Sequence, residues 1–91
     1  MSLGVVNGKA ISLPKPNYSE IAKRMRAEGL VRVQVLVDLD GRVISATVLN
    51  GSPFLRAEAQ KAAMQARFSP TLLNNQPVQV SGIIIYNFQL Q

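Results

Sequence analysis

The sequence predicts an α+β fold in which two helices pack on one face of a three-stranded sheet. Three observations support this prediction: two stretches with helical spacing of apolar residues, three stretches with strand-like alternation, and a hairpin signal between the first two strands. With 91 residues, the chain has room for one modest core, so residues 1–91 are expected to form a single domain.

The first 13 residues predict a short hairpin or strand ahead of the main fold. Asn7-Gly8 lies between apolar residues, and this pair favours a two-residue turn. Pro14 and Pro16 then end the ladder and force an extended connection. Residues 1–3 are typical of an expression leader, and residues 1–4 lack a signal-peptide pattern. We therefore expect an anchor or signal, if the protein has one, to lie upstream of this sequence.

The first helix is predicted within "NYSEIAKRMRAEG". Apolar side chains at helical spacing form one stripe: Tyr18, Ile21, Ala22 and Met25. Ser19 or Asn17 is placed to cap its start, and Gly29 suits the left-handed position that ends a helix.

Two strands follow, joined by a tight turn. In "LVRVQVLVD" the alternation puts four valines on one face: Val31, Val33, Val35 and Val37. "DLDG" turns the chain at Asp40-Gly41, and "RVISATVLN" runs back. Asp38 and Asp40 resemble the start of a calcium loop, but the later ligands are missing. We interpret this stretch as a turn and predict no metal site.

The second helix is predicted within "GSPFLRAEAQKAAMQARF". Ser52 is placed at its cap and Pro53 at its first position. Its inner stripe is small enough to lie close over a sheet: Leu55, Ala59, Ala62, Ala63 and Ala66. Pro70 bars continuation, and "TLLNNQ" is expected to be a loop before the final strand.

The element order places the last strand, "PVQVSGIIIYNFQL", at an edge of the sheet. A right-handed crossover through the second helix sets it beside the first long strand, in a split β-α-β arrangement. Neither Pro nor a charged residue occurs from position 78 to 91, so nothing in the side chains blocks pairing there. The edge is expected to accept a partner's peptide strand or a second copy, or to be covered by the chain's own N-terminal hairpin.

Composition argues against an enzyme. The chain contains no histidine and no cysteine, and its serines have no neighbouring pattern that activates a nucleophile. No cofactor is predicted. The net charge of +5 suggests an acidic partner, but aromatic residues make up only 5% and are not interleaved with basic ones as a nucleic-acid platform requires. Nucleic acid is therefore an unlikely partner. We also expect Tyr86 and Phe88 to lie in the core with Ile84.

An ordered set of motifs closely resembles the C-terminal domain of TonB energy transducers, over about four-fifths of the chain. The matching features are Tyr18, Gly29, the valines of 31–37, Asp38 with Gly41, the alanines of 59–66, Phe68-Ser69-Pro70 and Phe88-Gln89-Leu90. One departure is Tyr18-Ser19, where the family has Tyr-Pro. Ser retains a capping hydroxyl, so the helix is expected to survive, although a prolyl contact with a receptor is lost.

The resemblance implies a periplasmic domain that is tethered to the inner membrane by an upstream region. Such domains bind the TonB box of outer-membrane transporters by strand addition, and inner-membrane proton-channel proteins supply the energy. The implied binding residues are Lys15, Pro16, Asn17, Tyr18, Val78, Val80, Gly82, Ile83, Ile84, Ile85, Tyr86 and Phe88. A strand-exchanged homodimer remains an alternative use of the edge. So does the same module serving as an interaction domain in an extracytoplasmic sensor or peptidase fusion.

Overall fold

A computed structural model, which describes residues 1–90, confirms the α+β class and the order of the main elements. The central strand of a four-stranded sheet is β3 (Gly29–Val37). It runs antiparallel to β4 (Val43–Asn50) on one side and to β8 (Val80–Phe88) on the other. The last strand therefore lies beside the first long strand, as the crossover argument predicts.

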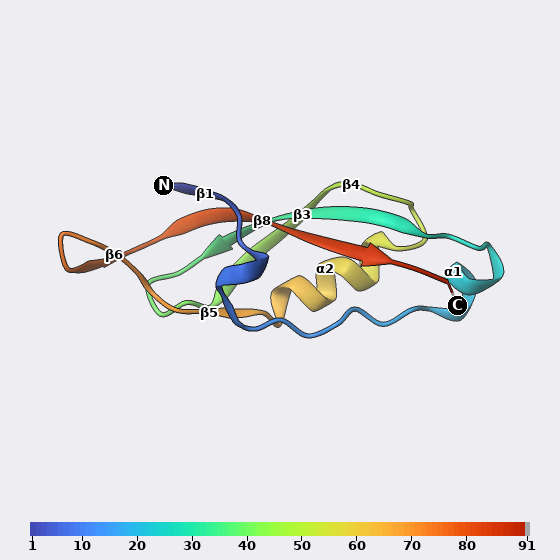
Figure 1. Cartoon of the computed structure of the whole chain (residues 1–91), viewed down its shortest axis with the longest axis horizontal. Coiled ribbons are helices and arrows are strands. Elements are labelled where there is room, and N and C mark those ends of the chain that lie inside the picture. The colour runs from blue at the N-terminus through green and yellow to red at the C-terminus, as the bar shows by residue number, and fades with distance from the viewer. Residues whose placement is uncertain (91) are drawn as a thin grey trace.

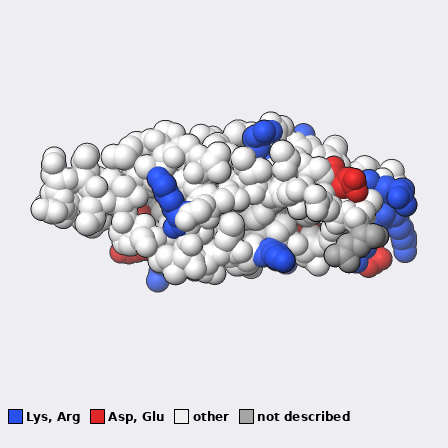
Figure 2. Space-filling model, in the orientation of Figure 1, with Lys and Arg blue, Asp and Glu red and all other residues white. Residues whose placement is uncertain are grey.

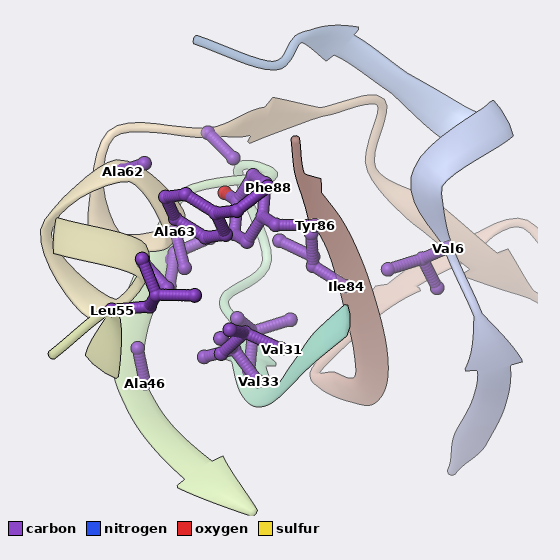
Figure 3. Close-up of a cluster of buried hydrophobic side chains, with 14 of the residues drawn as sticks. Val6, Val31, Val33, Ala46, Leu55, Ala62, Ala63, Ile84, Tyr86 and Phe88 are labelled. Atoms are coloured by element: carbon purple, nitrogen blue, oxygen red, sulfur yellow. The ribbon is translucent and has the colours of Figure 1, made fainter. Parts of the chain in front are cut away.

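One helix, α2 (Arg56–Met64), covers one face of the sheet at β3 and β4, and no α-helix among residues 1–90 covers the other face (Figure 1). The core lies between these two layers, where valines of β3 pack against small residues of α2, as predicted. Val31, Val33 and Val35 are fully buried, and so are Leu55, Ala59 and Ala63. Figure 3 shows this cluster together with Ile84, Tyr86 and Phe88 of β8. The short alanine side chains let the helix axis lie close to the sheet.

The molecule is elongated, with extents of 49 × 20 × 18 Å. At one end lies the hairpin of β6 (Thr71–Leu73) and β7 (Gln76–Val78), and at the other lies α1 (Glu20–Arg24) (Figure 1). Within residues 1–90, no helix is both long and apolar enough to span a bilayer.

The predicted N-terminal hairpin is wrong. β1 (Ser2–Val5) pairs in parallel with β8, whereas β2 (Ala10–Ser12) pairs with β5 (Arg67–Phe68) in a separate ladder. Between them, Asn7–Lys9 form the 3-10 turn η1. The favoured two-residue hairpin turns need positive φ at the first central residue (type II′) or at both (type I′), and neither Asn7 nor Gly8 has one. The main sheet therefore gains a fourth strand, and β8 is an edge over only part of its length.

The "TLLNNQ" stretch is a hairpin turn rather than a loop. Asn74 and Asn75 have φ of 53° and 65°, the pair of positive values that a type I′ turn requires. Val78, expected in the last strand, lies in β7 instead, where it pairs with Thr71 of β6.

The first helix is shorter than its apolar spacing predicts. Ser19 is its cap, since the Ser19 hydroxyl accepts the N–H of Ala22 at 3.2 Å. The left-handed residue that ends it is Arg26 (φ 53°) rather than Gly29, with Ala27 N–H bonded to Ala22 C=O. Ile21 and Met25 are more than half exposed, because α1 lies at the end of the sheet and only Ala22 reaches the core.

The second helix also starts later than expected. Residues 53–55 form a turn in which Ser52 C=O accepts the Leu55 N–H at 3.0 Å, and the helix begins at Arg56. At the β3–β4 turn, the Asp38 carboxylate accepts the backbone N–H groups of Asp40 and Arg42, both at 2.9 Å. Asp38 thus orders the turn, as the interpretation of "DLDG" predicts.

Candidate partner-binding edge

The outer side of β8 is occupied along its first half. Strand residues alternate, so on this side the pairing groups belong to residues 81, 83, 85 and 87. The Ser81 N–H donates to Met1 C=O at 2.8 Å, and the Ile83 C=O accepts the Val6 N–H at 2.9 Å. We call residues 81–85 the latched half of β8.

The Asn7 side chain closes the latched half. Its Nδ2 donates to the Ile85 C=O at 2.7 Å, and its Oδ1 accepts the Ile85 N–H at 2.9 Å. A primary amide presents a donor and an acceptor side by side, as the backbone of a neighbouring strand does. Asn7 therefore satisfies both backbone groups of Ile85 after β1 itself has ended at Val5.

Val6 holds the same segment against β8 by packing. It is only 2% exposed and joins the buried hydrophobic cluster from the N-terminal segment (Figure 3). A Cβ added to Gly82 would lie 2.5 Å from Val6 Cγ1, closer than atoms can approach. The absence of a side chain at Gly82 is what makes room for Val6.

Beyond Ile85 the outer side of β8 is open. Among the described residues, no strand and no side chain pairs with the outward N–H and C=O of Asn87, and its side chain is exposed. A groove of ≈ 370 Å³ lies here, which we call the edge groove. One wall is residues 85–89 of β8 and its extension, and the other is residues 13–16 with Tyr18.

Tyr18 fixes the second wall of the edge groove in place. Its hydroxyl donates to the Ala27 C=O, and its ring meets the Phe88 ring edge-on, with centroids 5.5 Å apart at 89°. Partial burial, with the charge of Glu28 adding to it, raises the pKa of the Tyr18 hydroxyl. The higher pKa keeps the hydroxyl protonated, and able to donate, further into the alkaline range.

Basic residues border the groove. Lys15 lines it, and a second hollow beyond Tyr18 is lined by Lys23, Arg26, Gln89 and Leu90. Figure 2 shows Lys and Arg gathered at the end of the molecule that carries α1, with acidic residues beside them. Lys23 makes an exposed contact with Glu20 at 3.7 Å, which screens only part of this charge. The border of the groove therefore favours an acidic segment.

The predicted site residues divide into three groups. Five offer neither a side chain nor pairing groups at the edge, because their backbone groups face β3: Val80, Ile84, Tyr86 and Phe88, whose side chains lie in the core, and Gly82, which has no side chain. Ile83 and Ile85 are half-buried and alternate to the open face of the sheet. Lys15, Pro16 and Tyr18 line the edge groove, whereas Asn17 faces α2 in a separate hollow, and Val78 lies outside β8.

Sequence reasoning missed Asn7 and Asn87. Asn87 had a signal, because it is a polar residue at the outward position that follows Ile83 and Ile85. Asn7 had none, since its partner Ile85 is 78 positions away. The burial of Tyr86 and Phe88 is confirmed at 6% and 4% exposure, so neither is available for base stacking.

The fold and the half-open edge together define a small interaction domain rather than an enzyme. The family described as Gram-negative bacterial TonB protein C-terminal matches residues 14–90, and the chain belongs to this family. The solution NMR structure of the Pseudomonas aeruginosa TonB C-terminal domain is similar to it, with 26% sequence identity and a TM-score of 0.72. That similarity covers 97% of this chain and 94% of the Pseudomonas chain. No curated protein sequence matches the chain.

Proposed function

We propose that this domain binds an extended segment of an outer-membrane transporter, the TonB box, along the open end of β8. The observation that carries the proposal is the unpaired outward backbone of Asn87 at the base of a groove. Strand addition supplies main-chain hydrogen bonds and needs few specific side chains. The family membership supports this class of partner.

The second wall of the groove is the second contact region of the proposal. Lys15, Pro16 and Tyr18 face a bound segment from the side opposite β8, whereas Asn17 faces α2 and contributes only its place in the chain between Pro16 and Tyr18. A segment in the groove then has backbone pairing on one flank and a proline-stiffened chain on the other. The basic border attracts acidic side chains of the segment.

The proposed role is mechanical coupling. The domain lies in the periplasm, and an upstream region tethers it to the inner membrane, where proton-channel partners supply energy. Backbone bonds in a strand pair are loaded together when the pair is pulled along its axis, so they resist shear as a group. This geometry suits a domain that transmits a pull to a transporter.

The test is an amide chemical-shift titration with a synthetic peptide that copies the TonB box of a Pseudomonas aeruginosa outer-membrane transporter. We expect the largest shifts at residues 85–89 and a smaller set at residues 15–18. The control is the same peptide with alternate backbone amides N-methylated, which removes its ladder donors and leaves its side chains. Equal shifts with both peptides, or shifts elsewhere, would contradict strand addition at β8.

A further inference from the structure

The N-terminal segment is held to β8 much as a bound peptide would be. β1 is the outermost strand of its sheet and pairs with β8 alone. Ser2, Gly4 and Val5 are exposed, Leu3 is half-buried, and Val6 is the single residue of the segment that is fully buried. The segment is therefore held by backbone bonds, by the buried side chain of Val6 and by the partly buried side chain of Leu3.

The segment and a partner strand require the same backbone groups. The N-terminal segment uses Ser81 and Ile83 through β1 and Val6, and Ile85 through Asn7. A strand that enters the edge groove meets Asn87 first, and its next pairing position along β8 is Ile85. Asn7, which lines the groove, already occupies that position.

We propose that residues 4–7, which follow the leader-like residues 1–3, form an intramolecular latch that a partner strand must displace to pair with the whole of β8. With the latch closed, one outward position is free, namely Asn87; with it open, the outward positions 81, 83, 85 and 87 all become available. The chain has a place to release it, because Gly8 is exposed and even an added Cβ there would meet no atom within 4 Å beyond its chain neighbours, while β2 just beyond is anchored to β5. The apparent affinity for a strand that pairs with the whole of β8 is the intrinsic affinity multiplied by the fraction of molecules in which the latch is open. This gating rests on the proposed function, whereas the closed latch itself can be tested without a partner.

The first experiment compares Asn7→Asp with the neighbouring control Gly8→Ala. The carboxylate that replaces the Asn7 amide cannot donate to the Ile85 C=O and sets a negative charge beside it, whereas a methyl group at Gly8 meets no atom within 4 Å. Amide hydrogen exchange of Ile85 is the partner-free measurement. We expect it to accelerate at least about tenfold in N7D and to stay at the wild-type rate in G8A. Unchanged exchange at Ile85 in N7D would overturn the latch.

The second experiment locks the latch in the full chain. Val5 and Ile83 are register partners on adjacent strands, and the chain has no native cysteine, so Val5→Cys with Ile83→Cys gives one removable bridge. The probe is the TonB-box peptide described above. We expect it to bind the oxidised protein at least about fivefold more weakly than the same protein after reduction.

The outcomes separate the two proposals. Equal affinity of the oxidised and reduced proteins would overturn gating, because the partner would then need only the open end of β8. Binding to neither form, together with accelerated exchange at Ile85 in N7D, would overturn the proposed function and leave the latch in place.

Discussion

The two halves of β8 have the same kind of sequence but different neighbours. Residues 81–85 are paired on both sides, with β3 inward and with β1 and Asn7 outward. Residues 86–88 are paired only with β3, although the side chains of Tyr86 and Phe88 are buried like that of Ile84 in the first half. The packing of the core therefore fixes the position of β8, whereas the short N-terminal segment determines how much of its outer edge is free to pair.

The largest stability effect is expected from Gly82→Ala in the latched half. Its new Cβ would lie 2.5 Å from Val6 Cγ1 and 3.3 Å from the Gly4 C=O, so Val6 must leave its position. Overpacking of this kind costs about 1–3 kcal/mol of unfolding free energy. Urea unfolding measures the loss, with Gly8→Ala as the neutral control. An unchanged midpoint would mean that Val6 contributes nothing to holding the segment.

A smaller effect, on binding alone, is expected from Asn87→Pro in the open half. Proline removes the outward N–H at a position that makes no such bond within the chain, and edge strands tolerate it. We expect the affinity for the TonB-box peptide to fall at least about tenfold, while the unfolding free energy changes by less than about 1 kcal/mol. Asn87→Ala keeps the N–H and should bind within about twofold of wild type.

Wild-type affinity in the Asn87→Pro protein would show that Asn87 is not a pairing position. The same proline at Ile85 is a less specific change, since the Ile85 N–H already bonds to Asn7. Its effects would combine loss of the latch with loss of a partner bond.

The smallest effect is expected from Tyr86→Phe, which alters the buried side of the open half. The Tyr86 hydroxyl is buried with no hydrogen-bond partner within the described residues, so its removal should change stability at pH 7 by less than about 0.5 kcal/mol. Burial also raises the pKa of Tyr86 from 10.0 to about 12. The folded state therefore holds the Tyr86 proton more tightly than the unfolded chain does. The stability that this difference supplies is complete below pH 10 and is lost as the pH rises toward 12.

Urea unfolding of both proteins at pH 7 and in steps above pH 10 measures this difference. Wild type should lose more stability than Tyr86→Phe above pH 10, and the two should agree below it. A large loss at pH 7 in the variant would mean that the hydroxyl does have a partner.

The sheet and its covering helix could be predicted from sequence because their signals are periodic. The valines of β3 and the alanines of α2 each report which face is buried, and the fold confirms both. The turn at Asn74-Asn75 was also within reach, since two asparagines suit positive φ. The end of α1 was not, because Arg26 is an unusual residue at a left-handed position and Gly29 is the expected one.

The site was predicted only in outline. Strand alternation placed Ile84, Tyr86 and Phe88 correctly in the core, whereas the element order made all of β8 an edge and the structure leaves only part of it so. The local signal at Asn7-Gly8 was misleading, because the Asn7 amide gains two bonds to Ile85 that a local turn cannot offer. A contact between residues so far apart in the chain leaves no periodic trace in the sequence.

The most direct test of the division of β8 is amide hydrogen exchange of the wild-type protein without a partner. The comparison is between Ile85 and Asn87, two outward positions one pleat apart on the same strand. We predict that the Ile85 amide is protected at least about 100-fold more than that of Asn87. Equal protection of the two amides, whether both fast or both slow, would contradict a β8 that is latched along one half and open along the other.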